Sequence, residues 1–144
     1  MIDAGRLRAL LDRLTAEVSH LKRLANMPDE ELMGDDDRIA AVKYRFIVAI
    51  ETCIDAGNHI IASEGLRAPR DYADVFAVPA EAGFVPAESA PTLGTMARFR
   101  NLLVHECLAI EDDRVAEVLR SSLGDLEALR TSIGHAAVGG HEPE

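Results

Sequence analysis

Apolar side chains recur every three or four positions along most of the chain, which is the pattern of helices that bury one face. Residues 3–24 show it first, through Leu7, Leu10, Leu11, Leu14, Val18, Leu21 and Leu24. Residues 26–28, which include Asn26 and Pro28, are expected to end this helix. In the acidic stretch that follows, Asp35, Asp36 or Asp37 is expected to cap the next helix.

The second predicted helix spans residues 38–62 and is apolar over much of its circumference. Its apolar positions are Ile39, Val42, Phe46, Ile47, Ile50, Cys53, Ile54 and Ile60. A helix of this kind is buried by several neighbours or by a second subunit. Gly57 lowers the helix propensity of this stretch, so we expect that it allows another element to pack closely.

Residues 65–92 interrupt the helical pattern with four prolines and two glycines. Within them, residues 71–78 are predicted to form one or two helical turns, with Tyr72, Val75 and Phe76 turned inward. A connection of this length in a compact domain tends to be functional or to cover another part of the molecule.

Two further helices are predicted. One begins after Pro91 and runs to about Ile110, and the last starts at Asp112 or Asp113 and ends at Gly134. The sequence therefore predicts an all-α protein, an antiparallel bundle of four to five helices in a single domain, residues 1–134. Residues 135–144 are expected to form a flexible tail.

Composition and charge narrow the function classes. The two cysteines are too few for a disulfide framework and favour a reduced, cytoplasmic setting. We expect no signal peptide and no apolar run long enough to span a membrane. The net charge of −10 excludes nucleic-acid binding by bulk electrostatics, so any action on RNA would need a local basic site or a basic seam between subunits. The acidity also suits a basic partner protein.

The stretch from Arg98 to Cys107 holds the candidate chemistry. Arg100 and His105 are five positions apart, about 140° around an ideal helix, so they do not share a face. Asn101 and His105 are four apart and do share one. A site that uses both Arg100 and His105 needs side chains that reach around the helix, or a homodimer in which two copies of the helix meet.

Such residues suit the cleavage of RNA without a metal. The reaction needs a base for the 2′-hydroxyl, an acid for the leaving oxygen and positive charge beside the phosphorus. Histidine acts as base or acid near neutral pH, and arginine grips a phosphate through two parallel hydrogen bonds. The alternative is that Arg100 and His105 are ordinary helix residues in a polar seam.

Glu51, Asp55 and His59 lie on one stripe of the second predicted helix. Three interpretations stay open. The two acids pair with Arg100 or with other arginines near the site and position the guanidinium, the stripe is an ionic seam that sets helix register, or the three residues bind a divalent metal.

The segment Arg100-Asn101-Leu102-Leu103-Val104-His105 resembles the Arg-x4-His signature of the HEPN superfamily, and its form RNxLVH resembles the HepT branch. Residues 42–76 are similar to the second helix and following loop of that group, and the resemblance covers about residues 32–119. It implies a dimerising helical bundle with a metal-independent endoribonuclease activity, a toxin whose partner is a MntA-type nucleotidyltransferase antitoxin. Arg100 and His105 match the catalytic pair and Asn101 the polar residue of the motif; no cofactor and no metal are implied.

Cys107 departs from the family pattern, in which a tyrosine that the partner can adenylylate often occupies this position. Cys107 is thus a candidate modification position whose usual acceptor is missing. Two hypotheses follow from the resemblance. The chain is an RNA-cleaving homodimer, or it is a non-catalytic helical adaptor that binds a nucleotide or its nucleotidyltransferase partner. A third hypothesis, independent of the resemblance, is a helical bundle that has no functional site.

Overall fold

The structure, a computed structural model, describes residues 2–105 and 110–138. All of the secondary-structure elements in these residues are α-helices. The helices are α1 (Ala4–Ala25), α2 (Asp29–Met33), α3 (Asp36–Glu64), α4 (Asp74–Glu81), α5 (Ser89–His105) and α6 (Asp112–Ala137). The predicted all-α bundle is confirmed. The described residues hold six helices rather than four to five, because the acidic stretch forms the short α2 and the proline-rich connection contains α4.

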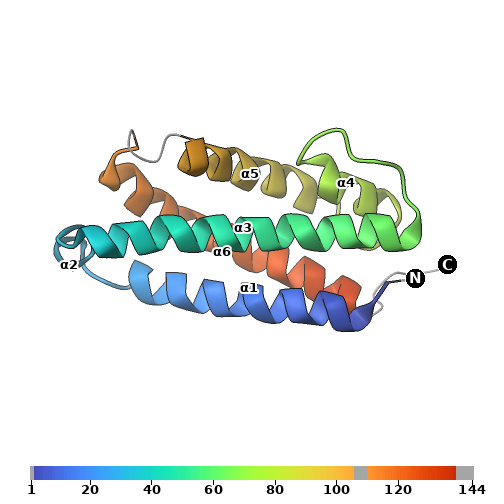
Figure 1. The fold of residues 1–144 in the computed structure, drawn as a ribbon, viewed down its shortest axis with the longest axis horizontal. Helices are drawn as coiled ribbons and strands as arrows, with labels where there is room; N and C mark the ends of the chain where they lie inside the picture. The colour runs from blue at the N-terminus through green and yellow to red at the C-terminus, as the bar shows by residue number, and fades with distance from the viewer. Residues whose placement is uncertain (1, 106–109, 139–144) are drawn as a thin grey trace.

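The long helices α1, α3 and α6 lie lengthwise against one another, and α4 and α5 cover a further side of α3 (Figure 1). Helix α3 contacts each of the other five helices. Twelve of its residues are buried, which confirms that its apolar circumference reflects several neighbours. Helix α5 runs back along α3, so residues from the two helices meet side by side although they are far apart in sequence.

By length and mean hydropathy, α3 would also qualify as a membrane-crossing helix, unlike the expectation from sequence. However, 56% of the most apolar 18-residue stretch of α3 is buried inside the bundle. The apolar residues of α3 are therefore used for packing against other helices, as in the central helix of a helical core.

Local signals set most of the helix boundaries. The Asp3 carboxylate accepts a hydrogen bond from the backbone N–H of Arg6 and caps α1, and Asp35 does the same for α3 through the N–H of Asp37. Asp35 is thus the cap among the three predicted candidates. Helix α3 ends at Gly65, whose φ of 63° lies in the left-handed region that glycine adopts without strain.

Two predicted boundaries were wrong. Helix α5 begins at Ser89, before Pro91, because proline is tolerated in a first helical turn where its missing N–H would have no partner. The buried Ser89 hydroxyl forms a 2.8 Å hydrogen bond with the hydroxyl of Ser132. Helix α6 continues through Gly134 to Ala137, because Ala136 and Ala137 are buried in the core. The first three residues of the predicted tail are therefore helical.

Gly57 lies where α4 crosses α3. A Cβ atom at this position would stand 2.7 Å from the carbonyl oxygen of Val75 and 2.9 Å from the ring of Phe76. Pro79, four residues after Val75, has no N–H to donate to that carbonyl, so the carbonyl is left facing Gly57. The predicted close packing at Gly57 is confirmed, and it sets how closely α4 and the loop before it approach α3.

We expect Gly57→Ala to lower the free energy of unfolding by about 1–3 kcal/mol, since an added methyl group must push against backbone. Urea denaturation measures the change. Gly124→Ala is the matched control, because nothing lies within 4 Å of a Cβ atom there and the change should stabilise α6 by up to about 1 kcal/mol. Equal effects at the two glycines would contradict the role of Gly57.

Candidate functional site

The guanidinium of Arg100 is held by its own chain. Its Nη1 donates to the Asn101 Oδ1 at 2.7 Å, and its Nη2 donates to the hydroxyl oxygen of Tyr72 at 3.3 Å. The Arg100 side chain is only 15% exposed, although it belongs to the last two turns of α5. An arginine that is this enclosed and still charged needs such partners.

Glu51 is the acid that lies beside Arg100. Its Oε2 is 3.6 Å from the Arg100 Nε, an ion-pair distance that is too long for a hydrogen bond. The Arg100 Nε itself is buried, and none of the described residues accepts a hydrogen bond from it. Glu51 is thus positioned to balance the charge of Arg100. The Nε–H of Arg100 is a donor that no described residue uses.

Asp55 and His59 do not join this arrangement. Asp55 is exposed, and no ion pair reaches its carboxylate within the described residues. The His59 Nε2 lies 3.3 Å from the backbone N of Asp3 and 3.3 Å from the Ser63 hydroxyl, at the far end of α3. In the described part of the chain no three His, Cys, Asp or Glu side chains are grouped as metal ligands.

His105 is the last residue of α5, and its side chain is exposed. It makes no hydrogen bond or ion pair with Arg100, as expected for positions about 140° apart on one helix. Within the described residues, one chain therefore presents an enclosed arginine and an exposed histidine on the same part of α5, without a contact between the two. Cys107 lies outside the described residues.

Tyr72 is a site residue that the sequence analysis missed. It was expected to point inward from a short helix, but α4 starts two residues later and the Tyr72 side chain is 38% exposed. Its ring centroid lies 5.1 Å from the Arg100 Cζ, within the range of a cation–π contact. The only signal in the sequence was an aromatic residue in a long connection.

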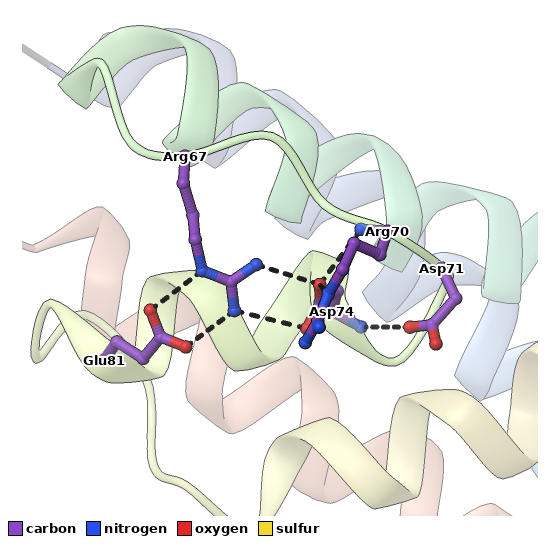
Figure 2. Close-up of polar contacts among 5 residues, drawn as sticks. All are labelled: Arg67, Arg70, Asp71, Asp74 and Glu81. Carbon is purple, nitrogen blue, oxygen red and sulfur yellow. Dashed lines mark hydrogen bonds and ion pairs between the residues drawn. The ribbon is translucent and has the colours of Figure 1, made fainter.

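The loop that carries Tyr72 is fastened to α4 by charged side chains (Figure 2). Arg67 binds both Asp74, at 3.0 Å, and Glu81, at 2.6 Å, and the Arg70 Nε binds Asp74 at 3.0 Å. The Asp71 carboxylate accepts from the N–H of Asp74 at 2.9 Å at the start of α4. These contacts hold the loop on both sides of Tyr72.

Asp74 is the centre of this network and is only 6% exposed. Hydrogen bonds from Arg67, and then from Arg70, hold the pKa of its carboxyl far below the usual range. In the unfolded chain the carboxyl takes up a proton near pH 4, whereas in the folded protein it stays charged. The network therefore stabilises the fold above that pH, and the contribution is lost as the pH falls towards the folded-state pKa.

We expect Asp74→Asn to flatten the dependence of the unfolding free energy on pH between about pH 5 and pH 2. Urea denaturation at a series of pH values measures this slope for the parent and the variant. Asp55→Asn is the control, because the exposed Asp55 has no ion pair and its loss should leave the slope unchanged. If both variants keep the parental slope, protonation of Asp74 is not the cause of the pH dependence of the unfolding free energy.

An apolar hollow of about 660 Å³ adjoins the end of α5. It lies between the first half of α3 and the last turn of α5, and is lined by Asp36, Ile39, Ala40, Lys43, Tyr44, Ile47, Leu103, Val104 and Asp112. Tyr44 is 61% exposed and Val104, next to His105, is 45% exposed. Large apolar side chains gathered in this way on a surface mark a contact region.

Comparisons of the sequence with known proteins point to one family. The sequence profile of the family Ribonuclease HepT-like matches residues 14–133. The mRNA nuclease HepT of Shewanella oneidensis is 31% identical over 77 residues, which cover 54% of this chain and 58% of that relative. The matched segment thus spans little more than half of the curated relative.

Two solved structures share the fold over nearly the whole chain. A tri-AMPylated HEPN toxin of Shewanella oneidensis in complex with an MNT antitoxin has a TM-score of 0.78 and 22% identity, covering 93% of this chain and 98% of that chain. The cytosolic protein of unknown function YutE from Bacillus subtilis has a TM-score of 0.80 and 16% identity, covering 99% of this chain and 96% of that chain. At these identities the likeness concerns the fold.

Proposed function

This chain belongs to the Ribonuclease HepT-like family, and on that premise we propose that it is a metal-independent endoribonuclease, the toxin of a toxin–antitoxin pair. Arg100 and His105 are the proposed catalytic residues, supported by Asn101 and Glu51. The observation that carries the proposal is the enclosed, charged Arg100 guanidinium on the same helix end as the exposed His105. A relative of this chain is itself an mRNA nuclease.

The proposed reaction uses only groups that the chain supplies. His105 takes the proton of a ribose 2′-hydroxyl, and the 2′-oxygen then attacks the adjacent phosphorus. The bond to the 5′-oxygen breaks, and that oxygen takes a proton from a protonated histidine. The products are a 2′,3′-cyclic phosphate and a 5′-hydroxyl end. Arg100 stabilises the negative charge that develops on the phosphate oxygens.

The active form proposed here is a homodimer. One chain offers a single His105, while the reaction needs a base and an acid, and Arg100 does not contact His105 within one chain. The apolar hollow between α3 and α5 is the proposed contact surface, because Tyr44 and Val104 line it and Val104 is adjacent to His105. A second copy seated there would bring the two ends of α5 together.

The proposed partner is a MntA-type nucleotidyltransferase antitoxin. A structural relative is an AMPylated toxin in complex with an MNT antitoxin. The net charge of −10 suits docking to a basic protein surface, and the low cysteine content suits the cytoplasm. With Cys107 in place of the family tyrosine, we propose control by binding of the antitoxin rather than by adenylylation at this position.

The second candidate function is a non-catalytic adaptor that binds a nucleotide or the nucleotidyltransferase. The observation that favours it is the engagement of Arg100 by three residues of its own chain, Asn101, Tyr72 and Glu51. In that case the guanidinium serves the fold and the same surface docks the partner.

Incubation of the purified protein with a mixed RNA pool in EDTA separates the two functions. The nuclease is expected to produce fragments with 2′,3′-cyclic phosphate ends, and the double variant Arg100→Ala, His105→Ala is expected to leave the pool intact. The variant must unfold at the same urea concentration as the parent. An intact RNA pool with both proteins, each a tight dimer, would favour the adaptor.

A further inference from the structure

One loop residue, Tyr72, makes both a hydrogen bond and a ring contact with the Arg100 guanidinium. Tyr72 precedes Arg100 by 28 positions, yet its hydroxyl oxygen is 3.3 Å from the Arg100 Nη2 and its ring centroid is 5.1 Å from the Cζ. The hydroxyl sets the direction of one N–H bond, and the ring lies against the guanidinium. Together they define the orientation of the planar group.

This orientation leaves donors for a substrate. A guanidinium has five N–H donors in a fixed plane. One on Nη1 is used by Asn101, one on Nη2 by Tyr72, and the Nε–H is buried beside Glu51 without a hydrogen bond. Within the described residues, the second N–H on each Nη atom has no acceptor. Each of these N–H groups can donate to an oxygen of a phosphate group.

Tyr72 is suited to hold Arg100 because the loop around it is itself held. Asp74, immediately C-terminal to the loop, binds Arg67 and Arg70 within it, and the Asp71 carboxylate accepts a hydrogen bond from the N–H of Asp74 (Figure 2). The close packing of Val75 and Phe76 on Gly57 sets the distance between α3 and the start of α4, where the loop ends. A support that is anchored in this way restricts the arginine before any substrate binds.

We propose that Tyr72 is a positioning residue of the site, whose hydroxyl and ring orient the Arg100 guanidinium so that its two unused N–H groups face the phosphate of a bound RNA. This inference rests on the proposed function of Arg100 and adds a residue from outside the Arg-x4-His segment. Tyr72 acts through Arg100 and exchanges no proton with the RNA.

Steady-state cleavage of a single-stranded RNA by the parent, Tyr72→Phe and Tyr72→Leu tests the role. We expect kcat to fall about 10-fold when the hydroxyl alone is lost and about 100-fold when the ring is lost as well, because misplaced groups lose transition-state contacts. KM should stay within about 2-fold. A purely structural role would instead leave Tyr72→Phe, which keeps the ring, with the parental kcat.

Thr95→Val is the matched control. The Thr95 hydroxyl also accepts a hydrogen bond from an arginine of α5, the Arg98 Nη2, at the same distance of 3.3 Å. Deleting it removes a comparable contact on the same helix outside the site. We expect the kcat of this variant to equal that of the parent.

A second measurement does not depend on cleavage. In ¹⁵N NMR spectra, a held guanidinium rotates slowly about its Cζ–Nε bond and gives separate Nη signals. We expect the Arg100 signals to be separate in the parent and merged in Tyr72→Phe. Assignment through Arg100→Lys identifies them.

The two measurements separate the inference from the proposed function. Lower kcat together with faster Arg100 rotation in Tyr72→Phe supports both. If no protein cleaves RNA but the Arg100 signals merge in Tyr72→Phe, the nuclease fails and the positioning of Arg100 by Tyr72 stands. Equal kcat values for the parent and Tyr72→Phe overturn the inference, as do unchanged Arg100 signals when no protein cleaves.

Discussion

Replacement of His105 by alanine is expected to slow RNA cleavage by about 10²–10⁴-fold, the usual contribution of a general acid or base. The fold should not suffer, because His105 is exposed at the end of α5 and has no partner within the described residues. The unfolding free energy is therefore expected to change by less than about 0.5 kcal/mol. Single-turnover cleavage in EDTA and urea denaturation measure the two quantities.

His135→Ala is the control for this prediction, since His135 is equally exposed on α6 and lies outside the site. Its cleavage rate should match that of the parent. Arg100→Lys gives a complementary test, because lysine keeps the charge but loses the planar pair of donors. If His105→Ala cleaves at the parental rate, the histidine is not the acid or the base and the proposed reaction is wrong.

Replacement of Tyr44 by aspartate is expected to separate the proposed dimer and to abolish the proposed RNA cleavage with it. Tyr44 is 61% exposed in the isolated chain, so an aspartate is tolerated by the monomer, whereas a charge buried between two apolar surfaces is costly. Sedimentation at several protein concentrations should show a monomer. Cleavage should fall as far as in the His105→Ala variant, because a separated monomer holds one His105 and cannot supply both the base and the acid.

Val138→Asp is the matched control for the interface. Val138 is 73% exposed just beyond the end of α6, away from the hollow that Tyr44 lines. This variant should stay dimeric and active. A monomeric Tyr44→Asp protein that cleaves RNA normally would mean that one chain holds a complete site, and a dimeric one would move the interface to another surface.

Much of the architecture was predictable from sequence, because a helix that buries one face has apolar residues at regular, local spacings. The three- and four-residue spacing of apolar positions predicted α1, α3 and α6, and the three consecutive aspartates, of which Asp35 is the cap, indicated the start of α3. Gly57 indicated a close approach, since a glycine inside a buried helix lowers stability unless packing requires it. The five-residue spacing of Arg100 and His105 indicated that they do not share a helix face, and it left open whether their side chains reach around the helix or meet in a homodimer.

The composition of the site was decided by tertiary packing. Nothing local to Glu51 or Asp55 distinguishes them, yet of these two acids only Glu51 lies beside Arg100, because this part of α3 packs against the end of α5. Tyr72 reaches Arg100 only because Asp74 and its arginines fold the loop back over α5. Periodicity records that a residue is buried or exposed, but the identity of its neighbour depends on how helices distant in sequence are packed, and that is a property of the whole bundle.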